Sequence, residues 1–381
     1  MIKIGYVIDT IESPYAGTEK QLLTLVARLD RSAFEPHLIC LRSSPWLESA
    51  RLPCPVLVLG LQSFLSLDYL RAGRKFVGYC REHGLDMVQS FFVDSNLAAT
   101  LWAHRARVPV IVASRRNIGS GYWHNWRNVR LLRYLKRYVT CYLANSQAAA
   151  SEVVTVEGVS PSKTIVIPNA LDLKRFQKPD QTELTRIRRR WGFGPGDLVV
   201  GAVANLRPVK NLSLLVEAAT RVVDKYPQAK FVILGEGDQR ESLTLQIAAA
   251  GLSDRFALPG RSDSTERDLY ALDIAVLCSH KESLSNSLIE YLAAERAVVA
   301  SDVGGNAEII TDPALGLLFP AGDASALTDR ISSLIDNPDG RRSLGAAGRV
   351  SVEKRYSEAA IIARYEETYR TLAAGRGACC G

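Results

Sequence analysis

Two glutamates stand eight positions apart in the stretch ESLSNSLIE, residues 282–290, with three serines and an asparagine between them. Eight residues of α-helix turn through about 800° and rise about 12 Å, so two helical glutamates at this spacing would not converge on one atom. We therefore predict that Glu282 lies in a loop that leaves a strand, and that Glu290 lies in the first turn of the helix that follows.

The amino end of this helix, at Ser285, Asn286 or Ser287, would attract a phosphate through its N–H groups and its dipole. Each acid would then bind a neutral hydroxyl beside the phosphate. A nucleotide sugar presents its groups in this order, with ribose hydroxyls, a diphosphate and sugar hydroxyls. A structural alternative stays open, because Ser287 and Glu290 also fit a capping box, in which the Glu290 carboxylate accepts a hydrogen bond from the Ser287 amide.

Other predicted strand ends carry residues that suit a diphosphate. Arg207 and Lys210 follow the apolar run LVVGAVA, where their cations could hold phosphate oxygens. Gly235 and Gly237 follow FVIL, and residues 304–305, a second pair of glycines, follow AVVAS; glycines there would permit close approach of the backbone to a ligand. Solvated surface charges and plain turns remain the structural alternatives for these residues.

The elements that must position these residues alternate between short apolar runs and helical patterns. The runs are KIGYVI, HLICL, VLVL, DMVQS, VIVAS and TIVIP in the first half, then LVVGAVA, KFVILG, FALPG, DIAVLCS and AVVAS. This alternation predicts an α/β protein with parallel sheets and crossover helices. A chain of 381 residues has the length of about two such domains, and doubly wound sheets bind ligands at the carboxyl ends of their strands.

We predict domains over residues 1–172 and 173–356, facing each other across a cleft, with a last helix over 357–373 that packs back on the first domain. The polar segment after IPNALD, with RIRRR and GFGPGD, is predicted to be the linker.

Several function classes are disfavoured by what the sequence lacks. The first strand is not followed by GxGxxG but by a single glycine, Gly17, which argues against a nicotinamide dinucleotide. The seven cysteines form no CxxC pair and no cluster with histidine at metal-ligand spacing, so we expect reduced thiols and no metal site. No apolar run approaches the ~18 residues of a membrane span and no secretory leader is evident, so we expect a cytoplasmic protein.

The net charge of +7 is unevenly distributed. Residues 1–172 carry 20 Lys and Arg against 13 Asp and Glu, whereas residues 173–381 carry 27 of each. Residues 121–143 combine a cationic helical face with aromatic residues, which are Tyr122, Trp123 and Trp126. We expect this segment to rest on an anionic membrane surface, at the inner face of the cytoplasmic membrane. A solvated helix packed on its own sheet, or an arginine patch that binds a soluble phosphorylated acceptor, are the alternatives.

Ordered motifs in the second half carry a family resemblance. They are AVANLRPVKN, VILGEGDQR, the spacing of Glu282 and Glu290, and VVASDVGGNAEII, with weaker matches in AGTEKQLLTLVARL, LANSQA and IPNALD. The chain resembles the nucleotide-sugar-dependent glycosyltransferases of family 4, a retaining family with the two-domain GT-B fold. The resemblance implies transfer from a nucleotide-diphosphate sugar such as a UDP-sugar to a glycan or lipid-linked acceptor in bacterial cell-surface polysaccharide or glycolipid synthesis. Because no Asp-x-Asp occurs in the sequence to bind a bridging metal ion, we expect the transfer to need neither a metal nor another cofactor. No nucleic acid partner is expected.

The resemblance also assigns roles to individual residues. Glu282, which would bind donor-sugar hydroxyls, and the diphosphate-binding cations Lys210 and Arg207 form the expected catalytic set. The expected nucleotide-sugar-binding residues, among them Glu290 at the ribose and Arg261 over the base, are Glu290, Gly17, Asn205, Gly235, Arg261, Leu284, Ser285, Asn286 and Ser287.

The sequence departs from the family pattern in three places. Asn205 replaces the arginine of the common G-R-L-x-x-x-K pattern, which leaves open whether Arg207 takes its role. Residues 16–17 and 169–170 read Ala-Gly and Asn-Ala where relatives have Gly-Gly and Asn-Gly. Where relatives place a histidine close to the sugar the chain reads ASRRNIG, so that the candidates are Arg115, Arg116, Asn117 and His124. A GT-B sugar-nucleotide epimerase and a non-catalytic nucleotide-sugar-binding subunit remain the alternative functions.

Overall fold

The computed structural model describes residues 1–14, 17–119 and 125–375, and divides the chain into two compact units. The first unit consists of Met1–Ala170 and Ala359–Gly381, and the second of Leu171–Glu358. The boundaries expected from the sequence, at 172 and 356, lie close to these positions. Each unit is an α/β fold of the Rossmann type with its own parallel sheet.

The first unit contains a seven-stranded sheet in the order β3-β2-β1-β4-β5-β6-β7, in which all neighbouring strands are parallel. Its elements are β1 (Ile2–Ile8), α1 (Gly17–Arg28), β2 (Phe34–Cys40), α2 (Pro45–Ser49), β3 (Val56–Val58), α3 (Leu67–His83), β4 (Met87–Ser90), α4 (Val93–Ala106), β5 (Val110–Arg115), α5 (Trp126–Leu135), β6 (Cys141–Ala144), α6 (Gln147–Glu157), β7 (Thr164–Val166) and α15 (Glu358–Ala373).

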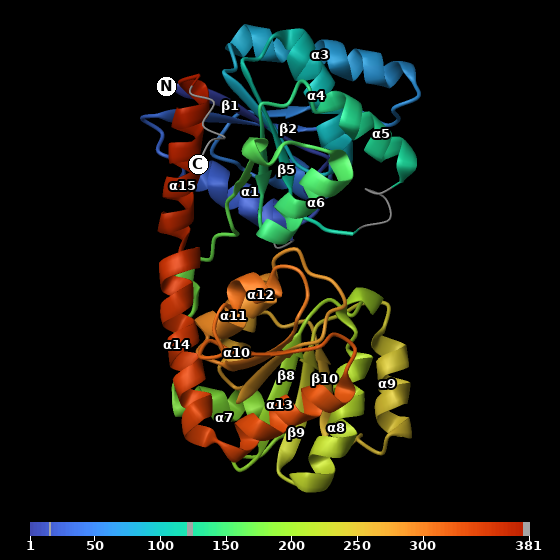
Figure 1. Ribbon diagram of the computed structural model, residues 1–381, viewed down its shortest axis with the longest axis vertical. Helices are drawn as coiled ribbons and strands as arrows, with labels where there is room; N and C mark the ends of the chain where they lie inside the picture. Colours follow the sequence, from blue (N-terminus) through green and yellow to red (C-terminus); the bar gives the residue numbers. More distant parts are fainter. Residues whose placement is uncertain (15–16, 120–124, 376–381) are drawn as a thin grey trace. The chain divides into compact units, whose positions relative to one another are not determined.

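Both faces of this sheet are buried, as expected for parallel strands between helices. Along β1, Ile4 and Tyr6 pack into the cluster that includes α1 and α15, whereas Val7 packs against α3 and α4 on the other face (Figure 1). The helix α15 is fixed by a buried polar contact as well as by packing, because the Tyr369 hydroxyl donates a hydrogen bond of 2.5 Å to the Gln89 side chain of β4. The carboxyl-terminal helix is therefore part of the first unit.

The second unit contains a six-stranded parallel sheet in the order β10-β9-β8-β11-β12-β13. Its elements are α7 (Gln181–Arg190), β8 (Leu198–Val203), a 3₁₀ turn (Pro208–Lys210), α8 (Ser213–Lys225), β9 (Ala229–Leu234), α9 (Arg240–Ala249), β10 (Phe256–Gly260), α10 (Thr265–Leu269), β11 (Ile274–Leu277), α11 (Asn286–Ala293), β12 (Ala297–Ser301), α12 (Asn306–Ile309), β13 (Leu317–Phe319), α13 (Ala324–Asp336) and α14 (Pro338–Tyr356).

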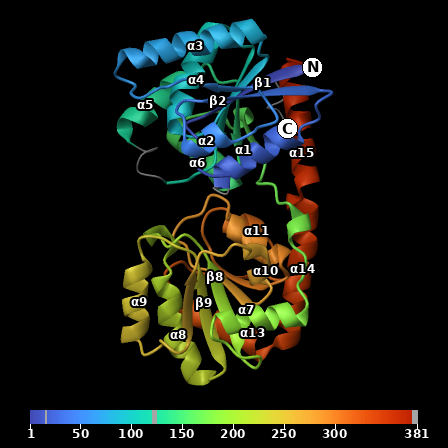
Figure 2. The same cartoon turned by 180° about the vertical axis from the view of Figure 1, so that it is seen from behind.

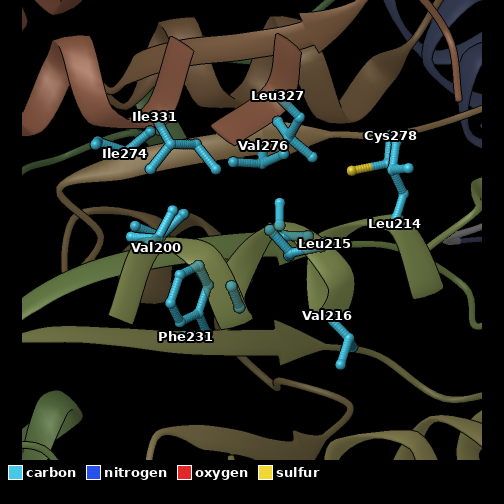
Figure 3. Packing of buried hydrophobic residues seen from close by; sticks show 14 of the residues in the cluster. Val200, Leu214, Leu215, Val216, Phe231, Ile274, Val276, Cys278, Leu327 and Ile331 are labelled. Carbon is cyan, nitrogen blue, oxygen red and sulfur yellow. The ribbon is translucent and has the colours of Figure 1, made fainter. Parts of the chain in front are cut away.

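Successive residues of these strands enter two different cores. Val200 and Phe231 pack with residues of α8, α9 and α13, and Figure 3 shows Val200, Leu215, Phe231 and Val276 in this packing. Val199 and Val232 point to the opposite face and pack with residues of α7, α11 and α14. This alternation follows from the two-residue period of a strand.

Three expectations about the elements were wrong. The short strands β6 and β13 were not predicted. The polar segment with RIRRR is not a linker but the helix α7, whose Ile187 is buried in the core of the second unit together with Trp191 and Phe193. The basic helix of residues 121–143 covers only Trp126–Leu135, because Cys141 already begins β6; Tyr122 and Trp123 lie outside the described residues.

Within the described part of the chain, the cysteines at positions 40, 54, 80, 141 and 278 form no disulfide with one another, while Cys379 and Cys380 lie outside it. Within the described residues no three His, Cys, Asp or Glu side chains are grouped as a metal site would need. None of the helices over those residues is both long enough and apolar enough to cross a membrane.

Candidate functional site

The second unit brings two loops that are distant in sequence together at the carboxyl ends of its central strands. Strands β8 and β11 are neighbours although β9 and β10 lie between them in the sequence, so the strand order reverses at this point. The loops that leave the carboxyl ends of β8 and β11 therefore meet, and the His280 amide donates a hydrogen bond of 2.8 Å to the Val209 carbonyl. Such a topological switch point is where open α/β sheets bind ligands.

An ion pair joins these two loops. The Lys210 Nζ donates to Glu282 Oε1 at 2.6 Å, and the Ser279 hydroxyl donates to the same oxygen at 2.6 Å. Only 24% of the Lys210 side chain and 10% of the Glu282 side chain are exposed. Glu282 lies in the loop after β11, as its position in the sequence predicted. A cation and a carboxylate are thus in contact at the carboxyl ends of the central strands, and both side chains are largely shielded from solvent.

Local sequence explains why Lys210 stands where it does. Pro208 begins a 3₁₀ turn, for which its fixed φ is suited, and Lys210 is the last residue of that turn. Asn211 ends it in the left-handed conformation, with φ 47°, which asparagine tolerates better than most residues. The turn places the lysine side chain toward the loop that carries Glu282.

The helix α11 begins four residues after Glu282, and its first turn differs from the prediction. Ser285 is the N-cap, and its hydroxyl accepts a hydrogen bond of 3.2 Å from the Leu288 amide. The capping box between Ser287 and Glu290 is therefore wrong, because Ser287 is inside the helix and its hydroxyl donates to the Val203 carbonyl at 3.1 Å. Glu290 lies in the second turn of α11 rather than in the first.

A residue that sequence reasoning missed anchors α11 to β8. The buried Tyr291 hydroxyl accepts a hydrogen bond of 2.7 Å from the Val203 amide and lies 3.2 Å from the Val203 carbonyl. This contact and that of Ser287 hold the start of α11 against the end of β8. The only sequence signal was a tyrosine within an otherwise aliphatic buried face. Ser279 was also missed, although a polar residue directly after the apolar run DIAVLC was a usable sign.

The glycines of the neighbouring loops have a structural reason that differs from the one expected. A Cβ on Gly235 would lie 1.9 Å from the Ala204 carbonyl oxygen, and a Cβ on Gly237 would lie 2.5 Å from the Leu206 carbonyl oxygen. A Cβ on Gly305 would lie 2.0 Å from the Ser283 carbonyl oxygen. These glycines allow the loops of the site to pack closely on one another. Close approach of a ligand to the same backbone stays a prediction.

The remaining expected residues of the second unit are placed less tightly. Arg207, Asn205 and Arg261 are exposed, with Arg207 and Asn205 linked through a backbone hydrogen bond of 2.8 Å. Leu284 is buried in the core beneath the loop. The structure therefore brings Lys210 and Glu282 into contact and places Ser285 and Ser287 on the helix that follows, while Arg207 and Arg261 present their side chains to solvent.

The first unit carries another expected residue, Gly17, which begins α1. Arg115, a candidate to replace the histidine of relatives, is buried, and its guanidinium donates to both carboxylate oxygens of Glu157 at 2.7 and 2.8 Å and to Asn96 at 2.8 Å. Its role is therefore to hold β5 to α6 and α4. Arg116 is hydrogen-bonded to Asn169. His124 lies outside the described residues.

Asp9 marks the switch point of the first unit, where β1 and β4 are neighbours. Phe92, the N-cap of α4, has the uncommon φ of 61° and no side-chain cap. Asp9 replaces that cap, because its Oδ1 accepts a hydrogen bond of 2.8 Å from the Ser95 amide and another from the Ser95 hydroxyl. Burial raises the pKa of Asp9 to about 6. Sequence reasoning did not single out this carboxyl.

Two family models match the chain, one in each unit. The model "Glycosyl transferases group 1" matches residues 184–351, and the model "Glycosyltransferase Family 4" matches residues 15–175. Between them they cover most of the chain, including the loops of Lys210 and Glu282 and the start of α1.

Individual relatives and solved structures agree with these matches. The chain is 27% identical over 216 residues to the N-acetyl-alpha-D-glucosaminyl L-malate synthase of Bacillus anthracis, covering 56% of each chain. It is 30% identical over 200 residues to the GDP-mannose-dependent monoacylated alpha-(1-6)-phosphatidylinositol monomannoside mannosyltransferase of Corynebacterium glutamicum, covering 50% of this chain and 52% of that one. The match thus spans about half the length of these curated relatives.

The fold is also that of Anabaena HepE, solved in complex with UDP, with a TM-score of 0.86 at 22% identity over 97% of this chain and 100% of that one. The same protein in complex with UDP-glucose gives a TM-score of 0.82. At this level of identity the likeness concerns the fold.

Proposed function

Because the chain belongs to the nucleotide-sugar glycosyltransferases of family 4 and has their GT-B fold, we propose that it transfers a sugar from a nucleotide-diphosphate sugar to a glycan or lipid-linked acceptor, with retention of the anomeric configuration. The observation that supports this most directly is the contact of Lys210 with Glu282 at the switch point of the second unit. The donor binds there, at the carboxyl ends of β8 and β11, and the first unit binds the acceptor.

Each member of the site has a distinct task in this proposal. As the bond between sugar and diphosphate breaks, negative charge grows on the leaving phosphate. Lys210 and the positive end of α11 stabilise that charge because they are held in place before the reaction begins. Glu282 accepts hydrogen bonds from donor-sugar hydroxyls, and Glu290 from those of the ribose. Arg207 is exposed at the same loop and binds the outer oxygens of the diphosphate.

The comparisons suggest which donor and acceptor to try first. HepE is solved with UDP and with UDP-glucose, which favours a UDP-sugar, although the relative from Corynebacterium is GDP-mannose-dependent. The same relative acts on a phosphatidylinositol mannoside, which favours a lipid-linked acceptor of the kind used in cell-surface glycolipid or polysaccharide synthesis. The proposed transfer requires neither a metal ion nor another cofactor, since the sequence has no Asp-x-Asp to hold one beside the diphosphate.

A thermal-shift panel of nucleoside diphosphates and nucleotide sugars tests the donor site. A ligand present at 100 times its Kd stabilises the protein by about 2.7 kcal/mol, so the matching nucleotide will stand out from the others. Release of free nucleoside diphosphate that depends on an added acceptor then establishes transfer, and the configuration of the product establishes retention. Donor binding without release would favour a non-catalytic binding subunit, and conversion of the donor sugar alone would favour an epimerase.

We also propose that α5 contacts an anionic membrane surface, over a smaller area than the sequence suggested. Trp126, Arg127 and Arg130 are exposed. Two other cations are engaged elsewhere, because Arg133 donates a hydrogen bond of 2.9 Å to the Val156 carbonyl and Lys136 donates to a carbonyl that follows α6. Reversal of charge at Arg127 and Arg130 should therefore weaken binding to anionic vesicles, and equal binding to neutral vesicles would contradict the proposal.

A further inference from the structure

Three large leucines project from the first unit at the start of α3. Leu65, in the turn before the helix, is 99% exposed, and Leu67, its first residue, is 67% exposed. Leu70 is exposed one turn further along. Single exposed leucines are ordinary on protein surfaces, but three within six residues form an apolar tip that folding itself does not use.

The turn that carries Leu65 is held in a defined position. Its neighbour Phe64 packs against Tyr69 with ring centroids 5.7 Å apart, and Tyr69 packs against Trp102 of α4 at 5.0 Å. Ser66 caps α3, since its hydroxyl accepts a hydrogen bond of 3.2 Å from the Asp68 amide. Because these contacts fix the residues on both sides of it, Leu65 faces solvent as part of the fold.

The apolar tip continues into a cationic face of the same helix. Arg71 lies one turn after Leu67, and Arg74 lies one turn after Leu70, and both arginines are exposed. The buried residues of α3, Ala72, Phe76 and Cys80, lie on its other side. Asp68 is the only acid between positions 48 and 82, and it is 3.6 Å from Arg71.

Helix α5 extends this surface. Figures 1 and 2 show the start of α3 and the helix α5 on the same side of the first unit, with α4 between them. On α5, the side chains of Trp126, Arg127 and Arg130 are exposed. The chain from 95 to 151, which includes α5, contains no acidic residue.

We propose that Leu65, Leu67 and Leu70 insert into the interfacial region of an anionic lipid bilayer while the arginines of α3 and α5 contact its headgroups. Apolar side chains at a tip with cations beside it match the two layers of such a surface, in which hydrocarbon lies beneath negative charge. A second copy of the chain fits less well, because a symmetric interface through this surface would bring Arg71 and Arg74 of both copies into one contact area. The inference rests on the proposed function in one respect, which is that contact with the membrane would bring the protein to a lipid-linked acceptor.

Cosedimentation of the full chain with vesicles tests this insertion. The vesicles contain phosphatidylcholine with phosphatidylglycerol, or phosphatidylcholine alone. The doubly substituted variant Leu65→Asp, Leu67→Asp is expected to bind the anionic vesicles at least about tenfold more weakly than the native chain, a factor that corresponds to about 1.4 kcal/mol. Leu245→Asp is the matched control, since Leu245 is 65% exposed on α9 of the second unit, and it should bind like the native chain.

Two further measurements on the double variant distinguish a loss of membrane insertion from a failure of the proposed transferase function. The variant should retain the thermal shift caused by the nucleotide ligand, which depends on the second unit, and it should retain the native melting temperature, which shows that it is folded. Equal vesicle binding by the native chain and the double variant, or no binding by either, would overturn the insertion and leave the donor site untouched. Self-association of the native chain that the double variant abolishes, without any vesicle binding, would assign the leucines to a second copy instead.

Discussion

Removal of Lys210 should destabilise the protein even though the residue is proposed to act on the donor. In Lys210→Met the Glu282 carboxylate stays in a site where only 10% of it is exposed, with Ser279 as its remaining hydrogen-bond donor. Removal of one partner of a fully buried pair costs about 3–5 kcal/mol. Since the Lys210 side chain is 24% exposed, solvent screens part of the interaction, and we expect about 1–3 kcal/mol.

The double variant Lys210→Met, Glu282→Gln is expected to regain most of that stability. No charge is then left without its partner, and the amide oxygen of the new glutamine can still accept the hydrogen bond from Ser279. The coupling between the two positions should therefore be about 1–2 kcal/mol and of stabilising sign. Transfer should be undetectable in Lys210→Met, in Glu282→Gln and in the double variant, because the proposed function requires both the diphosphate-binding cation and the sugar-binding carboxylate.

The measurement is a cycle of four melting curves, in which about 2–4 °C per kcal/mol is expected for a unit of this size. Lys225 and Asp336 supply a matched control in the same unit, since they form an ion pair of 3.2 Å with both side chains more than half exposed. Their coupling should be below about 1 kcal/mol. Additive effects of Lys210→Met and Glu282→Gln would refute the contact as an energetic pair, and transfer activity in the double variant would refute the roles of both residues.

Glu290→Gln is expected to abolish transfer and to leave the melting temperature nearly unchanged, because Glu290 does not form the cap of α11 and glutamine keeps the length of the side chain and an acceptor oxygen; a native rate of transfer would contradict its role at the ribose. The raised pKa of Asp9, about 6 against an ordinary 3.8, means that the folded state keeps a proton that the unfolded chain loses, so stability should fall as the pH rises from about 4 to 6 and stay level above that. Asp9→Asn, which keeps an acceptor for Ser95, should remove this slope in urea denaturation, and an unchanged slope would show that another group causes it. Full activity is expected to survive EDTA, and a loss that Mg²⁺ or Mn²⁺ restores would overturn metal-independent transfer.

The general fold was predictable because it depends on local patterns. Runs such as LVVGAVA and DIAVLCS are buried on both faces, so they are apolar throughout and stand out from the helices around them. The strands β6 and β13 read CYLA and LLF and contain no β-branched residue, whereas the equally short β3 and β7 read VLV and TIV and were predicted. Likewise RIRRR looked like a linker because its charged residues outnumber the one apolar residue, Ile187, that packs α7 into the core.

The sequence supplied candidate residues for the site but not the contacts between them. Lys210 and Glu282 are 72 positions apart, and their pairing depends on the reversal of strand order between β8 and β11. No single-sequence pattern specifies that order. The same limit applies to Gly235, for which a ligand was the expected neighbour, whereas the Ala204 carbonyl lies where its Cβ would be. Local reasoning identifies which residue types suit a diphosphate, and topology decides which of them meet.

The ion pair also bears on how a donor would bind. Under the proposed function, a diphosphate that approaches Lys210 competes with Glu282 for the same ammonium group, so binding exchanges one anionic partner for another. Glu282 would then lose its cation while it remains largely buried, a state that is favourable only if donor-sugar hydroxyls and Ser279 replace the lost contact. Such an exchange makes the affinity for the donor depend on both its diphosphate and its sugar.

A nucleoside diphosphate, which lacks the sugar, leaves Glu282 without replacement partners and should therefore stabilise the protein less than the complete nucleotide sugar at the same concentration. An equal or larger thermal shift with the nucleoside diphosphate would show that Lys210 can bind phosphate without releasing Glu282.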